Sequence, residues 1–155
     1  MVNNAEARLA ASGIELPPAP TPFGAYVPAV QTGNLLFLTG TLPTAGHHAT
    51  FLGRAGKEFN AEQARRAAYA AALNALAMAR QHLGSLDRIS RVVKLAVYIA
   101  TFDDFADHVT VADAASELLR DILGEDKMST RLVFGVASLP LGVPVELEVI
   151  LEVSA

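Results

Sequence analysis

Charged side chains near the carboxyl end of the chain lie beside apolar runs that are typical of β-strands. Arg131 stands at the start of the run 132–137. The next run, 143–153, alternates valine and leucine with three glutamates: Glu146, Glu148 and Glu152. Such alternation is typical of a half-buried strand. A cation and a carboxylate brought beside a sheet suggest a site, because these groups bind anions and transfer protons.

The segment 139–142 separates these two runs and contains Pro140 and Gly142. Proline fixes φ, and glycine supplies the conformational freedom that a chain reversal needs. The pattern therefore predicts a hairpin or tight reversal in the middle of a sheet. For Arg131 the residues alone leave two roles open, a salt bridge to a strand carboxylate such as Glu146 or Glu148, or contact with a ligand.

The preceding sequence predicts the elements that position these side chains. They are a strand pair 24–30 and 35–40, a short strand near 50–52, a helix 60–83, a strand 89–100 and a helix 101–123. The first helix starts with a capping box at Asn60 and Gln63, and the second starts with the acidic pair Asp103-Asp104. We expect an α+β fold with two helices packed on one face of a mixed sheet.

Two further features complete the expected fold. Residues 1–22 read as an N-terminal extension of one domain, 1–155, with a short helix that Asn3 or Asn4 caps and Gly13 ends. The last strands should also leave an apolar sheet face uncovered. Such a face usually marks an association surface.

Composition sets the limits on function. The chain has 155 residues, 52% of them hydrophobic and 18% charged, which indicates one globular domain. The amino terminus lacks the basic start and apolar stretch of a signal peptide, so we expect a cytoplasmic protein without a membrane partner. The absence of cysteine excludes a thiolate nucleophile, and His47-His48 lacks metal-ligand spacing, so neither a metal nor an organic cofactor is expected.

The carboxy-terminal pattern of an arginine, several apolar residues, Leu-Pro and Val-Glu-Leu-Glu resembles the signature of the YjgF family, also called the Rid family of enamine/imine deaminases. The resemblance runs from about Gly24 to Val153. It implies a chorismate-mutase-like fold and a homotrimer with sites in the clefts between subunits. By resemblance, Arg131 binds the carboxylate of the substrate and Glu146 polarises water.

The resemblance also assigns further residues to the site. Gly-x-Tyr and Thr-Gly steps near the start of the family pattern correspond to Tyr26 and to Thr39-Gly40, and the Asp-Phe step corresponds to Phe105. Val133 would contact the substrate through its backbone. Lys94 matches a lysine near the site, although the residues alone favour a strand lysine whose ammonium reaches solvent.

Three departures separate the chain from the small deaminases. Ser129 replaces a proline two residues before the arginine, and Val133 replaces a cysteine found in many members. The second helix looks longer and lacks an asparagine shortly after the Asp-Phe step. These features resemble a longer, less characterised branch of the family.

The expected activity is hydrolysis of small 2-imino or 2-enamino acids to ammonia and a 2-oxo acid. One alternative is a non-catalytic trimer that binds a small carboxylate and acts as a sensor or regulatory partner. A ribonuclease is the other alternative, since four cations lie close in sequence: Arg54, Lys57, Arg65 and Arg66. The net charge of −4 and the few aromatic residues argue against a nucleic-acid partner.

Overall fold

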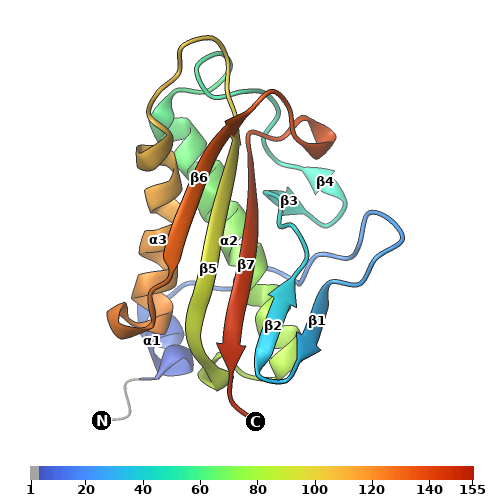
Figure 1. Ribbon diagram of the computed structural model, residues 1–155, viewed down its shortest axis with the longest axis vertical. Coiled ribbons are helices and arrows are strands. Elements are labelled where there is room, and N and C mark those ends of the chain that lie inside the picture. Colours follow the sequence, from blue (N-terminus) through green and yellow to red (C-terminus); the bar gives the residue numbers. More distant parts are fainter. Residues whose placement is uncertain (1–3) are drawn as a thin grey trace.

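A five-stranded mixed sheet forms the centre of the computed structural model, which describes residues 4–155 (Figure 1). The strands follow the order β1-β2-β7-β5-β6. They are β1 (Ala29–Thr32), β2 (Leu35–Leu38), β5 (Ile89–Ala100), β6 (Thr130–Val136) and β7 (Val145–Val153). Strands β5 and β6 are parallel, and the other neighbouring pairs are antiparallel. The predicted mixed sheet is confirmed.

Helices cover one face of this sheet, as predicted. The two long helices are α2 (Ala61–Leu83) and α3 (His108–Leu123), and a short helix, α1 (Ala5–Ser12), packs beside α3. The face of α2 towards the sheet is rich in alanine, so the helix axis can lie close to the strands. No helix among residues 4–155 is both long and apolar enough to cross a membrane.

The predicted caps of α1 and α2 are confirmed in detail. The Asn60 side chain accepts the Gln63 N–H at 2.8 Å, and the Gln63 side chain accepts the Asn60 N–H at 2.9 Å. This reciprocal pair satisfies two N–H groups that the first turn would leave free. Asn4 caps α1 in a similar way, and Gly13 ends that helix in the left-handed region. The other predicted cap, Asn3, lies outside the described residues.

The predicted hairpin between the last two strands is wrong. Strand β5 lies between β6 and β7, pairs with β6 in parallel and pairs with β7 in antiparallel register. The segment after β6 contains a 3₁₀ turn, Pro140–Gly142, that carries the chain past the end of β5. Proline and glycine predicted the reversal of direction correctly, but a reversal does not require the two strands to be neighbours.

The start of the second long helix also differs from the prediction. Helix α3 begins at His108, and the acidic pair before it lies in a turn, where Asp103 has a φ of 54°. The N–H groups of Thr101 and Phe102 donate to β6 and to the loop before α2, which extends the strand pairing beyond β5. Val109, the second residue of α3, is 60% exposed.

A small hairpin replaces the strand expected near residues 50–52. Its strands are β3 (Thr44–Ala45) and β4 (His48–Ala49). Gly46 lies in the turn with a φ of 60°, a conformation that glycine adopts without strain. This hairpin follows the segment that borders the predicted site.

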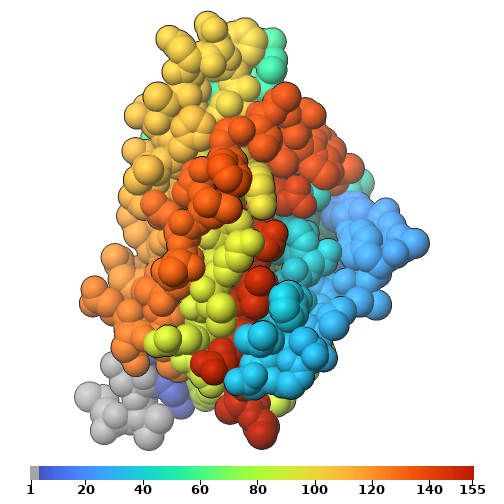
Figure 2. All heavy atoms as spheres, in the orientation of Figure 1, coloured from blue at the N-terminus to red at the C-terminus, as the bar shows by residue number. Residues whose placement is uncertain are grey.

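The uncovered face of the sheet, which faces the viewer in Figure 2, carries both charged side chains, such as Lys94 and Glu148, and apolar ones. The valine and leucine side of β7 packs under the helices, so the prediction of an uncovered apolar face was wrong for this strand. The other of the last two strands, β6, does leave apolar side chains exposed. The exposed large apolar residues of the sheet strands are Val30, Phe37, Val93, Leu132 and Phe134.

Candidate functional site

Glu146 lies on the uncovered side of β7, in a pocket of about 460 Å³. Tyr98, its cross-strand neighbour on β5, lines the same pocket together with Phe37 and Leu139. Burial raises the pKa of the Glu146 carboxyl above its ordinary value, because desolvation disfavours the charged form. A carboxylate with a raised pKa is a stronger base than an ordinary one and is suited to take a proton from water.

The other two glutamates of β7 are already engaged by neighbouring side chains. Glu148 accepts a hydrogen bond from Lys94 at 2.8 Å, and Glu152 accepts one from Asn34 at 3.2 Å. Glu146 makes no side-chain hydrogen bond or ion pair with any residue that the structure describes. It is therefore the glutamate of this strand that is available to a ligand or water.

Gly40 lines the Glu146 pocket, and its lack of a side chain leaves room for the Glu146 carboxylate. A Cβ atom at this position would collide with a carboxylate oxygen of Glu146. Glycine at position 40 therefore leaves room for the carboxylate in this position, whereas a larger residue would displace the flexible end of the Glu146 side chain. Gly40 does not have a positive φ, so the reason for glycine here is space and not backbone conformation.

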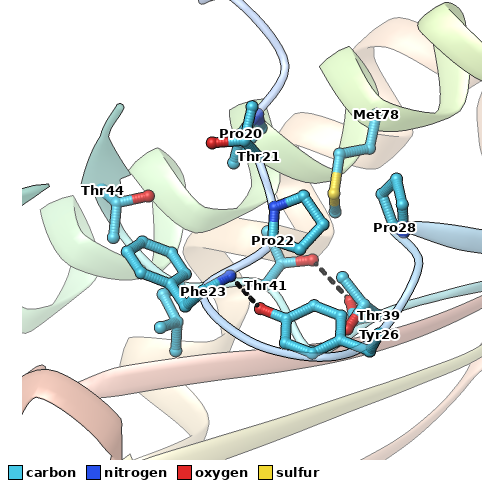
Figure 3. A pocket seen from close by; sticks show the side chains of 12 residues that line it. Pro20, Thr21, Pro22, Phe23, Tyr26, Pro28, Thr39, Thr41, Thr44 and Met78 are labelled. Carbon is cyan, nitrogen blue, oxygen red and sulfur yellow. Dashed lines mark hydrogen bonds between the residues drawn. The ribbon is translucent and has the colours of Figure 1, made fainter. Parts of the chain in front are cut away.

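Tyr26 and Thr39 line a second, smaller hollow, with Gly40 on its border (Figure 3). Its volume of about 20 Å³ leaves room for about one water molecule. The Tyr26 hydroxyl accepts the N–H of Phe23 at 2.9 Å, which fixes the ring over the proline-rich segment. Tyr26 is 44% exposed, so its ring remains accessible from outside the chain.

Arg131 lies on the opposite face of the sheet, on the edge strand β6. It pairs in register with Leu95, which is fully buried on the helix side. Its Nη1 donates to Asp113 Oδ1 at 2.6 Å and to Ser116 Oγ at 3.1 Å, both on α3. The salt bridge considered from the sequence therefore exists, but its carboxylate comes from a helix and not from a strand.

Val133 and Phe105 belong to the same side of the sheet as Arg131. Val133 follows Arg131 by two positions on β6, and both Val133 and Phe105 pack against the core. Phe105 precedes α3, and its ring contacts His108 edge to face at 5.5 Å between centroids. Lys94 lies on the other face, where it pairs with Glu148 as a strand lysine.

The predicted site residues thus form two groups within one chain. The first group is Arg131, Val133 and Phe105, at the edge where β6 meets the helix layer. The second group is Glu146, Gly40, Tyr26 and Thr39, around the open face and the end of β2. Strand β5 separates the strands of Arg131 and Glu146, about 10 Å apart, and their side chains point to opposite faces. A single chain does not bring the two residues together.

Sequence reasoning missed two residues that shape these groups. Asn74 is buried in α2 and donates to the carbonyl oxygens of Leu42 and Thr44 at 2.9 and 3.0 Å. These bonds hold the segment that follows Gly40. In the sequence, the signal for Asn74 was a single amide side chain within an alanine-rich helix.

The second missed residue is Tyr98. Alternation along its strand places Tyr98 on the same face as Lys94, but the sequence could not place Tyr98 beside Glu146 without knowledge of the strand order.

His47 contacts the proline-rich segment near the start of the chain. His47 contacts Thr21 Oγ1 at 2.6 Å and lies edge to face against Phe23. Among residues 4–155 there is no group of three or more histidine, aspartate and glutamate side chains that could hold a metal ion.

Residues 6–151 match the family described as YjgF/chorismate mutase-like, putative endoribonuclease. The chain belongs to this family. The resemblance inferred from the arginine and glutamate motifs is therefore confirmed across nearly the whole chain, as is the chorismate-mutase-like fold.

The chain is similar in sequence and in fold to other proteins of known name. Protein TCP17 of Trypanosoma cruzi is 35% identical over 149 residues, which cover 96% of this chain and 93% of the relative. The crystal structure of Atu1372 from Agrobacterium tumefaciens is 36% identical, with a TM-score of 0.88 and coverage of 97% of this chain and 92% of that one. RidA from the Antarctic bacterium Psychrobacter sp. PAMC 21119 is 26% identical, with a TM-score of 0.60 and coverage of 87% and 94%.

The shape of the chain is closer to Atu1372 than to RidA, although both share its fold. The family assignment and these likenesses support a common fold.

Proposed function

We propose that the protein is an enamine/imine deaminase-like hydrolase that converts small 2-imino or 2-enamino acids into 2-oxo acids and ammonia. The observation that carries this proposal is Glu146, a half-buried carboxylate with a raised pKa, no side-chain partner among the described residues and an open pocket beside it. Membership of the family that includes RidA supports the same activity.

The proposed site lies between two copies of the chain. Because Arg131 and Glu146 are on opposite faces of one sheet, a neighbouring copy must supply one of them. The exposed apolar side chains on the uncovered face, including Phe37 and Phe134, would be buried in such an assembly. The family resemblance favours a closed homotrimer, in which each cleft contains Arg131 of one subunit and Glu146 of the next.

The chemistry needs only these side chains and water. The planar guanidinium of Arg131 can hold both oxygens of the substrate carboxylate and orient the imine carbon. Glu146 takes a proton from water as the water oxygen bonds to that carbon, which gives a tetrahedral carbinolamine. The proton then returns to the nitrogen, and the carbon–nitrogen bond breaks as the hydroxyl proton passes to the regenerated Glu146 carboxylate. A 2-oxo acid and ammonia leave, and Glu146 releases its proton to solvent. Tyr26 and Thr39 would contribute to the polar wall.

The two alternatives have weaker support. A non-catalytic carboxylate-binding trimer would use Arg131 in the same way, and the modest TM-score with RidA favours keeping it as the second candidate. A ribonuclease would need an open basic patch. Arg65 is instead paired with Glu117 at 2.7 Å, and Arg54 and Lys57 both lie over the ring of Phe102.

Ammonia release from freshly generated imino acids tests the proposal. An amino acid oxidase acting on leucine, methionine or alanine would supply the 2-imino acids, and a coupled assay would follow ammonia. We expect the protein to accelerate release well above the spontaneous rate in water. Binding of the matching 2-oxo acids without any acceleration would support the carboxylate-binding alternative instead.

A further inference from the structure

The ion pair between Arg131 and Asp113 uses only one nitrogen of the guanidinium. Nη1 carries two hydrogens, and its two acceptors are Asp113 Oδ1 at 2.6 Å and Ser116 Oγ at 3.1 Å. One acceptor for each hydrogen satisfies this nitrogen. Both acceptors lie on α3, so the helix holds the guanidinium from one side.

The rest of the guanidinium is left for another partner. Nε and Nη2 of Arg131 donate to no residue in the part of the chain that the structure describes. They are not sealed from solvent either, since Arg88 Nε is the one side-chain nitrogen or oxygen among residues 4–155 that is both buried and without a partner. Nε and Nη2 form one edge of the planar group, and this edge can bind two carboxylate oxygens in parallel.

We infer that Asp113 is a positioning residue for the proposed reaction, one that turns the free edge of Arg131 towards the carboxylate of the substrate. The inference rests on the proposed function. An arginine side chain has many rotamers, and fixing them in advance reduces the entropy lost when a ligand binds. Ser116 supports the same orientation through the second hydrogen of Nη1.

Asp113 could instead act as a competitor for the guanidinium, and the two roles depend on different properties of the carboxylate. Positioning depends on an oxygen that accepts the Nη1 hydrogen, which an asparagine side chain also provides. Competition depends on the negative charge, which repels a second carboxylate nearby. Asp113→Asn keeps the oxygen and removes the charge, whereas Asp113→Ala removes both.

The experiment compares three variants with the wild type by titration with 2-oxobutanoate, a product-like 2-oxo acid. Asp113→Ala should raise the Kd and the KM for the imino acid by about threefold to tenfold with little change in kcat, because orientation of the carboxylate affects binding. Asp113→Asn should bind at least as tightly as the wild type. Asp121→Ala is the matched control, since it removes an acidic side chain of α3 whose one ion-pair partner among residues 4–155 is Arg120.

Thermal melting of each variant separates binding effects from folding effects. Weaker binding by Asp113→Ala, restored in Asp113→Asn and absent in Asp121→Ala, would support the positioning role. Tighter binding by both Asp113 variants would show competition and overturn it, and so would unchanged binding by Asp113→Ala. If the wild type itself binds no 2-oxo acid, the proposed function fails, which is a separate outcome from a failure of Asp113 alone.

Discussion

Replacing Glu146 with glutamine should lower the rate of ammonia release by about 10²-fold to 10⁴-fold, the usual contribution of a general base. Glutamine has nearly the same shape but cannot take a proton from water. Its amide should still fit beside Gly40, so carboxylate binding through Arg131 should remain close to that of the wild type. Single-turnover assays with freshly generated imino acids, combined with titration of a 2-oxo acid, would measure both effects.

The raised pKa of Glu146 also predicts a pH dependence with a defined sign. The catalytic form is the ionised carboxylate, so activity should rise as the pH increases through the raised pKa. Burial makes the folded protein hold this proton more strongly than the unfolded chain does. Ionisation of Glu146 therefore costs stability above the unfolded pKa, and Glu146→Gln should remove that cost.

Melting curves provide the control for this variant. Glu146→Gln should melt no lower than the wild type near pH 7, and the two proteins should converge at acidic pH, where Glu146 is protonated in both states. Full activity in a folded Glu146→Gln protein would rule out Glu146 as the base. A large loss of stability would instead indicate a structural role for its carboxylate.

Replacing Arg131 with alanine should weaken binding of small 2-oxo acids by roughly tenfold to a hundredfold or more, since a charge-assisted contact contributes about 1.5–3 kcal/mol. Arg131→Lys should restore only part of the affinity, because an ammonium keeps the charge but lacks the planar edge. Isothermal titration with 2-oxobutanoate would measure both variants.

The exposure of Asp113, the partner of Arg131, allows a loss of ligand binding in Arg131→Ala to be distinguished from a folding defect. Asp113 has 43% of its side chain exposed, so solvent can hydrate its carboxylate when the arginine is removed. We therefore expect only a small change in melting temperature for Arg131→Ala. A variant that melts much lower than the wild type, yet binds 2-oxo acids normally when folded, would show that Arg131 serves the fold and not the ligand.

Local sequence signals predicted the elements of this fold well. The capping box at Asn60, the glycine after α2 and the β-branched run of β5 depend on residues that are near one another in sequence, and each was found as predicted. The alternation in β7 was also correct. It assigned Val145 and Glu146 to opposite sides of the strand, as the structure shows.

Strand neighbours and side-chain faces could not be predicted in the same way. Which strand lies beside β7 depends on packing across the whole sheet, and the turn at 140–142 is compatible with either pairing. The start of α3 shifted to His108 because Thr101 and Phe102 pair with distant backbone groups. For the same reason, the sequence could suggest Arg131 and Glu146 as candidate site residues but could not predict that they lie on opposite faces.

Complementation between two inactive variants tests the proposed intersubunit site most directly. Arg131→Ala and Glu146→Gln would be co-expressed with different tags, and mixed assemblies would be purified with both tags. Light scattering would first confirm that each variant and each mixture is a trimer.

In a closed trimer whose clefts combine Arg131 of one subunit with Glu146 of the next, every mixed trimer contains one complete cleft out of three. We therefore predict that the mixture recovers about one third of the wild-type rate of ammonia release, although each variant alone is nearly inactive. Mixed trimers no more active than the separate variants would contradict a site that is shared between subunits.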